Sequence, residues 1–193
     1  MGDRSAFFYG TLMAPEVLHR VCHGPANPTF STAQSTYLKT SPAILHDYRR
    51  HRVKGADYPA ILPAPSSNVR GTFVTGLTDG DIYRLDIFEG DEYERRQVTC
   101  RLLTTLGDPM TGEGNVEGDE VRAETYVWIA GRGRLDDREW DFAEFQREKM
   151  RFWVGGGERA EREYAEVDEA VRNQVRADPV SYTHLTLPTK RIV

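Results

Sequence analysis

The sequence predicts an α+β fold in which a small mixed β-barrel with flanking α-helices is followed by a C-terminal helical pair. Two observations predict this architecture. Short strand-like runs, separated by glycine, proline and polar turns, recur from Ala6 to Ala130. Beyond them the chain is rich in charge, and its apolar residues recur at the spacing of an amphipathic helix. With 193 residues, 39% of them hydrophobic, the chain can form one domain with a sizeable core.

The chain opens with a predicted strand, a turn and a helix. Residues 6–9 form a short apolar strand, Gly10 breaks it, and Pro15 stands where a proline begins a helix. A strand that breaks just before a helix points successive backbone N–H groups at one spot, which favours a carboxylate or phosphate. A plain strand-ending turn explains the same residues, and local pattern alone favours it.

Two further segments predict extended structure. "AILHDYRRHRV" indicates a strand that ends near Val53. The proline-rich stretch that begins at Asp57 indicates an edge segment, followed by a separate strand over residues 69–74. The first could form a basic patch, and residues 57–60 could form a pocket wall. A strand with one charged face and a simple edge segment are the favoured interpretations.

Residues 78–81, "TDGD", resemble a capping box and predict a short helix that Gly90 ends. Ile82, Leu85 and Glu89 share one face of that helix. If this face packs on the barrel, burial and the negative end of the helix dipole both raise the pKa of Glu89. A carboxylate tuned in this way suits a general base near neutral pH. An exposed last-turn glutamate is the alternative, and spacing does not choose between them.

The second half of the barrel is predicted from two more strands. Residues 95–103 alternate and indicate a strand with one buried face, and residues 123–130 indicate another. Residues 107–120, between them, are acidic and glycine-rich without periodicity. We expect a mobile hairpin loop there, with no chemistry.

The C-terminal part is predicted to contain two helices, 137–154 and 158–175, separated by three glycines. The apolar stripe of the second consists of Ala160, Tyr164, Val167, Val171 and Val175. We therefore expect a barrel domain over residues 1–135 and a helical extension over 136–179 that packs on the same domain. Residues 180–193 resemble a translated sequencing adapter and are left out of the fold prediction. A genuine threonine-rich tail is the alternative.

Composition excludes several classes of function. The net charge of −5, with no long basic run, argues against nucleic acid and anionic membranes as partners. Cys22 and Cys100 have no metal-like spacing and are expected as reduced thiols, which favours a cytoplasmic location. His19 and His23 have i, i+4 spacing, but their helix ends at once and no further ligand is near. We expect no metal site and no membrane-spanning segment.

Five motifs in order, "FFYGTL", "YPAILP", "VRGTFV", "LDIFEGDEYERRQV" and "AETYVW", resemble the gamma-glutamylcyclotransferase-like family, in its avirulence-induced-gene branch. The resemblance covers residues 6–129, and the helices after Asp136 look like the extension of fungal members. It implies a small mixed β-barrel with flanking helices and no metal or organic cofactor. It also implies a small-molecule γ-glutamyl substrate, from which acyl transfer releases pyroglutamate and an amine or amino acid.

The resemblance also implies a set of site residues. Glu89 would be the catalytic acid and base, whereas Asp86 and Glu92 do not occupy the place of the motif's glutamate before a glycine. The substrate would be bound by the four residues of the turn, Tyr9, Gly10, Thr11 and Leu12. Tyr93 and Tyr126 would be supports whose hydroxyls orient the substrate or the glutamate. An inactive binding or regulatory module with the same fold is the alternative function.

Overall fold

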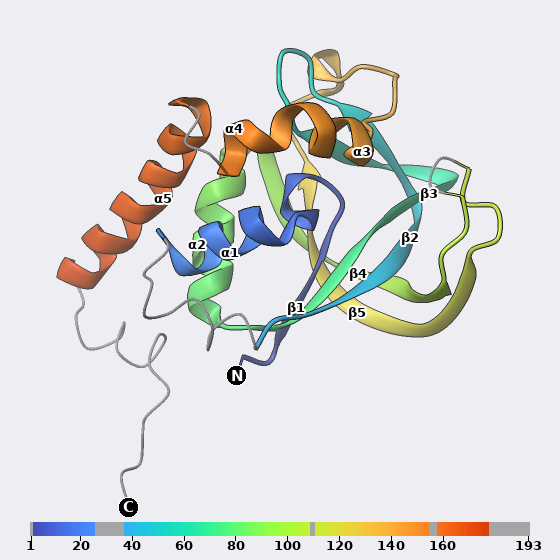
Figure 1. Cartoon of the computed structure of the whole chain (residues 1–193), viewed down its shortest axis with the longest axis horizontal. Coiled ribbons are helices and arrows are strands. Elements are labelled where there is room, and N and C mark those ends of the chain that lie inside the picture. Colours follow the sequence, from blue (N-terminus) through green and yellow to red (C-terminus); the bar gives the residue numbers. More distant parts are fainter. Residues whose placement is uncertain (1, 26–36, 109–110, 155–157, 178–193) are drawn as a thin grey trace, which may run out of the picture.

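The computed structural model describes residues 2–25, 37–108, 111–154 and 158–177. Its five strands close into a barrel in the order β1-β3-β2-β4-β5. The strands are β1 (Arg4–Phe8), β2 (Lys39–Arg52), β3 (Pro59–Leu77), β4 (Tyr93–Thr105) and β5 (Val116–Trp128). Adjacent strands are antiparallel except β1 and β5, whose parallel pairing at Ala6 and Glu124 closes the barrel. The predicted α+β barrel with flanking helices is confirmed (Figure 1).

The helices lie along one side of the barrel and across one of its ends (Figure 1). After β1 come a 3-10 turn, η1 (Thr11–Met13), and α1 (Pro15–His23), which begins at the proline as predicted. Helix α2 (Asp79–Glu89) begins with the predicted capping box. The Asp81 N–H donates to Thr78 Oγ1 at 3.1 Å, and the Thr78 N–H donates to Asp81 Oδ2 at 2.8 Å. Gly90, with φ of 71°, ends the helix in the left-handed region that favours glycine.

Two predictions between residues 57 and 120 were wrong in extent. The proline-rich segment and the strand after it form one strand, β3, because the pairing with β2 shifts register between His46 and Tyr48 and continues. Only β2 pairs with the proline-rich part, since β1 joins β3 from Thr72 onward. The loop expected over residues 107–120 is shorter, because β5 begins at Val116. The first residues of β5 lack an apolar face, and their pairing with β4 makes them part of the sheet.

The C-terminal helices also differ in part from the prediction. The first helical stretch begins at Phe142 instead of residue 137. Asp141 caps this start, because its side chain accepts a hydrogen bond from the Ala143 N–H at 2.8 Å. This stretch comprises α3 (Phe142–Glu144), the π-helical turn η4 (Phe145–Lys149) and α4 (Met150–Val154). Helix α5 (Glu158–Ala177) matches the prediction. The three glycines and the tail over 180–193 lie outside the described residues, and the division at residue 135 stays a prediction.

Strand β1 lies between two of the hydrophobic clusters that make up the core. Phe7 and Tyr9 point into the barrel, where they pack with Leu45, Ile61 and other buried side chains. Phe8 points the other way, into a second cluster formed by the helices and the outside of the barrel. This alternation is the period of two that a strand imposes. The turn after β1 therefore lies where the two clusters meet.

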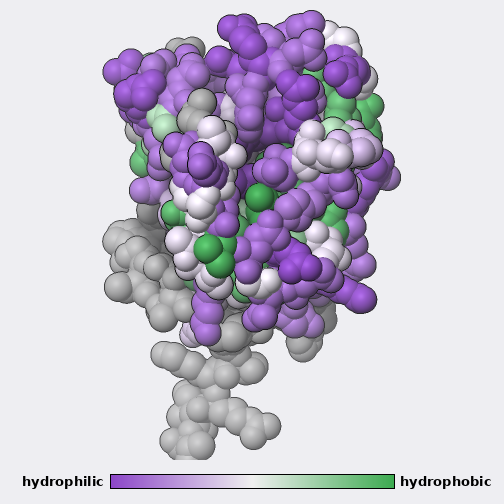
Figure 2. Space-filling view, turned by 90° about the vertical axis from the view of Figure 1, so that its right-hand side faces the viewer, coloured by the Kyte–Doolittle hydropathy of each residue, from purple (hydrophilic) through white to green (hydrophobic). Residues whose placement is uncertain are grey.

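The opposite side of the barrel is mostly hydrophilic, with hydrophobic side chains in small separate groups (Figure 2). Two short turns, η2 (Gly90–Glu92) and η3 (Arg132–Arg134), complete the described elements. Cys22 and Cys100 are buried free thiols, as expected. No helix within the described ranges has the length and apolar character needed to cross a membrane.

Candidate active site

The turn after β1 is closely packed against the beginning of β3. A Cβ atom on Gly10 would lie 2.8 Å from Cγ and Cδ of Pro59, so a glycine is needed here because of this close approach. Within the turn, the Met13 N–H donates to the Gly10 carbonyl at 2.9 Å and the Ala14 N–H to the Thr11 carbonyl at 3.1 Å. Among the described backbone hydrogen bonds, none uses the N–H groups of Gly10, Thr11 or Leu12. Within the described residues, these three donors therefore have no backbone partner.

Tyr9 ties the turn to β5. Its ring is buried, with 6% exposure, and its Oη donates to the Tyr126 carbonyl at 2.6 Å. Burial, followed by the charge on Glu89, raises the pKa of Tyr9 well above its ordinary range. The Tyr9 hydroxyl is therefore a neutral, fixed group, and Glu89 is close to it.

Glu89 is the last residue of α2, and its carboxylate has no hydrogen bond or ion pair with any residue that the structure describes. The residue as a whole is half-buried, but its carboxylate lies deep enough for desolvation to raise its pKa to about 8. The negative charges of Glu163 on α5 and of Asp86 on α2 act in the same direction. The carboxyl group can consequently hold and release a proton near neutral pH.

The hydroxyls of Tyr93 and Tyr126 are both fixed by hydrogen bonds. Tyr93 Oη donates at 2.8 Å to the carbonyl of Pro59, the residue that packs on Gly10. Tyr126 Oη donates at 2.8 Å to Asp86 Oδ1. Burial is the main cause that raises the pKa of both tyrosines, and the charge on Glu89 adds to it. The structure thus brings the predicted residues together from four elements, although their roles remain predictions.

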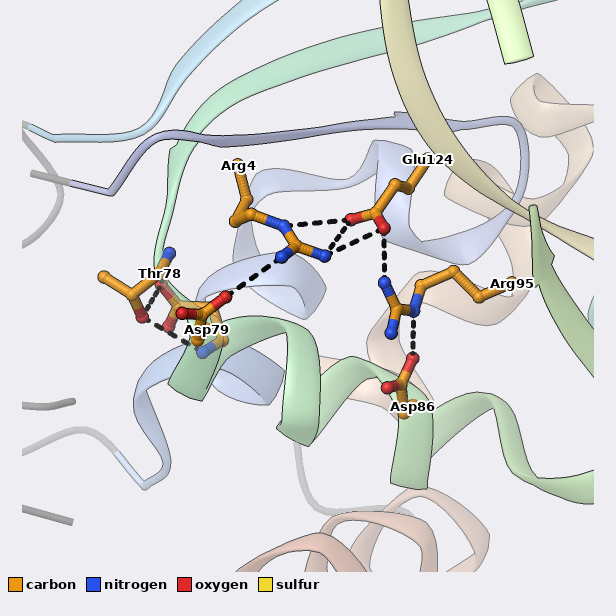
Figure 3. A network of polar contacts seen from close by, with 7 residues as sticks. Arg4, Thr78, Asp79, Asp86, Arg95 and Glu124 are labelled. Atoms are coloured by element: carbon orange, nitrogen blue, oxygen red, sulfur yellow. Dashed lines mark hydrogen bonds and ion pairs between the residues drawn. The ribbon is translucent and has the colours of Figure 1, made fainter. Parts of the chain in front are cut away.

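A chain of ion pairs runs beside α2 from its first turn to its last (Figure 3). Arg4 donates to Asp79 Oδ1 at 3.2 Å and to the two carboxylate oxygens of Glu124 at 2.9 and 3.0 Å. Glu124 also pairs with Arg95, whose Nε donates to Asp86 Oδ1 at 2.9 Å. This alternation of charges fastens α2 to β1, β4 and β5, the elements that carry or precede the site tyrosines.

Arg50 lies beside the turn and is a candidate site residue that the sequence analysis missed. Its Nη1 donates to the Tyr9 carbonyl at 3.0 Å, and its guanidinium lies 5.6 Å from the centre of the Trp140 ring. The side chain is 11% exposed, and its buried Nε has no hydrogen-bond partner within the described part of the chain. The signal in the sequence was Asp47, a residue type that tolerates a positive φ. Its φ of 61° accompanies the register shift that changes which face the following residues present.

The alternative acids are engaged elsewhere. Asp86 accepts hydrogen bonds from Tyr126 and Arg95, and Glu92 pairs with Arg134. Of the interpretations offered for residues 57–60, the edge segment agrees with the pairing of β3, and Pro59 also lies directly against the turn. His19 and His23 stack with ring centres 5.4 Å apart. No group of three or more potential metal ligands occurs in the described ranges.

The family of the chain follows from its similarity to known proteins. Residues 6–142 match the family model described as "Gamma-glutamyl cyclotransferase, AIG2-like". The chain is 34% identical over 150 residues to the Arabidopsis thaliana AIG2-like protein D, covering 76% of this chain and 81% of that protein. It is 30% identical to the Arabidopsis protein AIG2 C over 75% of this chain and 73% of the relative. A solution structure of an Arabidopsis protein superposes with a TM-score of 0.50 at 27% identity, covering 79% of this chain and 86% of the other.

Proposed function

Because the chain belongs to the AIG2-like gamma-glutamyl cyclotransferase family, we propose that it cyclises the γ-glutamyl group of a small molecule. In this reaction the α-amine of the substrate attacks its own γ-carbonyl carbon. A new C–N bond closes the pyroglutamate ring, and the bond to the original amine or amino acid breaks. The observation that carries the proposal is the Glu89 carboxyl group, with a pKa of about 8 and no partner among the described residues, close to a turn whose N–H groups have no described backbone partner.

Glu89 would carry the proton that the reaction moves. In its ionised form it takes a proton from the substrate ammonium, which makes the amine nucleophilic. In its protonated form it gives that proton to the leaving nitrogen. A group whose pKa is near the working pH populates both forms, which is the condition for efficient general acid–base catalysis. The nucleophile and the electrophile belong to one molecule, so positioning supplies much of the remaining rate.

The turn would hold the substrate α-carboxylate. The N–H groups of Gly10, Thr11 and Leu12 are the donors, and Arg50 strengthens one of them. Because Arg50 donates to the Tyr9 carbonyl, it withdraws electrons from the peptide that contains the Gly10 N–H. Arg50 also pairs with Glu139 at 3.1 Å, and this carboxylate offsets part of the positive charge that Arg50 places near the proposed anion. Two hydrogen bonds hold the turn in place. Tyr9 at the start of the turn donates to the Tyr126 carbonyl, and Tyr93 donates to the carbonyl of Pro59, which packs on Gly10.

The test is to incubate the purified protein with a panel of γ-glutamyl amino acids and γ-glutamyl amines and to measure pyroglutamate by mass spectrometry. We expect release from at least one member of the panel. Glu89→Gln is the matched control, because it keeps the shape of the side chain but cannot exchange a proton. Full activity in that variant would remove the mechanism. Calorimetric binding of a γ-glutamyl ligand without product over hours would identify an inactive binding module instead.

A second test addresses the turn. In Gly10→Ala the added methyl group overlaps Pro59, so the turn must move away from it. We expect KM to rise by about tenfold while kcat changes less, the loss that one or two weakened hydrogen bonds to a carboxylate produce. Gly133→Ala is the control, since a Cβ there meets no atom within 4 Å. An unchanged KM in Gly10→Ala would show that the turn does not bind substrate.

A further inference from the structure

Residues of the barrel fix the Asp86 carboxylate from two sides. Tyr126 on β5 donates to Oδ1 at 2.8 Å, and Arg95 on β4 donates to the same oxygen at 2.9 Å. Arg95 is itself held by Glu124, whose side chain is 13% exposed and is gripped by Arg4 (Figure 3). Asp86 is therefore the last member of a chain of alternating charges, and its carboxylate has a defined place.

That place is next to Glu89. The two residues are three apart on α2, so their side chains lie on the same face, and both belong to the helix's C-terminal end. The last turn contains no basic residue that would balance them. A second negative charge has thus been fixed beside the carboxylate that the proposed function uses as a proton carrier.

We propose that Asp86 is a positioning residue that acts through Glu89, its fixed negative charge favouring the protonated Glu89 that delivers a proton to the leaving nitrogen. This inference rests on the proposed function. Desolvation remains the largest cause that raises the pKa of Glu89, and Glu163 and Asp86 are the charges that add to it. The side chain of Asp86 keeps 39% exposure, so solvent screens part of its effect.

The other titratable and charged groups around Glu89 come from other elements than α2. Their effects on Glu89 can therefore be distinguished from that of Asp86 by mutation. Glu163 lies on α5, which packs against α2 through the stacked rings of Tyr164 and Phe88, 6.1 Å apart. The hydroxyls of the site tyrosines come from the barrel side, from Tyr9, Tyr93 and Tyr126. Arg95 is a cation behind Asp86, and its charge opposes that of Asp86.

The experiment measures the titration midpoint of Glu89 by carbon-13 NMR of its carboxyl group, identified by its absence in Glu89→Gln. In Asp86→Asn we expect the midpoint to fall by on the order of one pH unit. In Arg95→Gln we expect it to rise, because a cation has been removed. Asp79→Asn, at the other end of the same chain of ion pairs, is the matched control and should leave the midpoint unchanged.

The opposite signs distinguish electrostatic action from loosened packing. If the variants merely admitted water, the midpoints of Asp86→Asn and Arg95→Gln would both fall, and that result would overturn the inference. An Asp86→Asn midpoint equal to that of the wild type would also overturn it. Should Asp86→Asn fail to fold, Arg95→Gln decides alone, because the absence of a rise contradicts the proposal.

Activity supplies an independent readout. The acidic limb of the pH profile of kcat should move to lower pH in Asp86→Asn, with KM little changed. A wild-type protein that releases no pyroglutamate would sink the proposed function, yet the NMR titration would still decide what Asp86 does to Glu89.

Discussion

The two ends of helix α2 carry acidic residues in opposite electrostatic settings. At the beginning, Asp81 completes the capping box and Asp79 pairs with Arg4, where the positive end of the helix dipole favours both. At the end, Asp86 and Glu89 lie where the dipole disfavours them, and no basic residue of the last turn balances them. Asp86 accepts hydrogen bonds from Arg95 and Tyr126 on the barrel, but Glu89 has no partner among the described residues.

The difference teaches where this helix tolerates a destabilising group. A well-capped beginning and the ion pairs beside it hold α2 in place, which allows an unpaired acid at its other end. An ionisable group with a shifted pKa and no partner among the described residues is typical of a functional site. The following predictions test this contrast, from the largest expected effect to the smallest.

The largest effect is expected for Glu89→Gln. If the uncompensated end of α2 is the catalytic end, kcat for pyroglutamate release falls by about 10²- to 10⁴-fold, the range that general acid–base catalysis contributes. Steady-state assays on the best substrate of the panel measure it. A loss of less than about threefold would erase the distinction between the two ends.

The same variant should be more stable than the wild type at high pH. The folded pKa of Glu89, about 8, exceeds its ordinary value of 4.5, so between these values the folded state binds more protons than the unfolded state. The penalty for ionising Glu89 is absent below pH 4.5, grows as pH rises and is complete above pH 8. We expect Glu89→Gln to gain on the order of 2 kcal/mol at pH 9 and nothing at pH 4, measured by urea unfolding. An equal gain at both pH values would contradict this account.

At the beginning of the helix, Thr78→Ala should cost about 1 kcal/mol of unfolding free energy, because the capping hydroxyl accepts the Asp81 N–H. Thr78→Ser keeps the hydroxyl and should lose much less. Chemical denaturation measures both. The proposed mechanism uses no residue of this end, so kcat should be unchanged, and a large fall in kcat at full folding would show that both ends serve catalysis.

The smallest effect is expected for Asp79→Asn. The Asp79 side chain is 63% exposed, so its ion pair with Arg4 should contribute only about 0.5 kcal/mol or less, and less still at high salt. Denaturation at two ionic strengths measures it. A loss of unfolding free energy above about 2 kcal/mol would mean that the ion pair of Asp79 stabilises α2 more than its exposure indicates.

The bounds of α2 and the face that Glu89 shares were predictable, because their signals are local, but spacing left open whether Glu89 is buried. The capping box, the glycine stop and the shared face of Ile82, Leu85 and Glu89 all lie within a dozen residues. Arg50 was missed because Asp47 marks at most the register shift, whereas the burial of Arg50 also depends on Trp140, about ninety residues later. The start of β5 was missed because those residues have no buried face and are ordered by their partner strand.

The apolar stripe of α5 was visible in the sequence, but the surface that it covers was not. Four of its five residues are buried, and Val175 is half-buried. The surface against which these residues pack depends on contacts between segments far apart in the sequence. One example is the pairing of Asp168 on α5 with Arg20 on α1 and Arg84 on α2. The influence of Glu163 on Glu89 follows from this docking and has no local signal.

The docking of α5 has a consequence for how such a protein can diverge. This helix follows the residues that match the family model, yet Tyr164 stacks on Phe88, the neighbour of Glu89, and Glu163 raises the pKa of Glu89 itself. Substitutions in this helix can therefore change the pKa of the Glu89 carboxyl while every strand keeps its sequence. Two relatives with the same barrel could then reach their greatest rates at different pH values because of the helix that each has added.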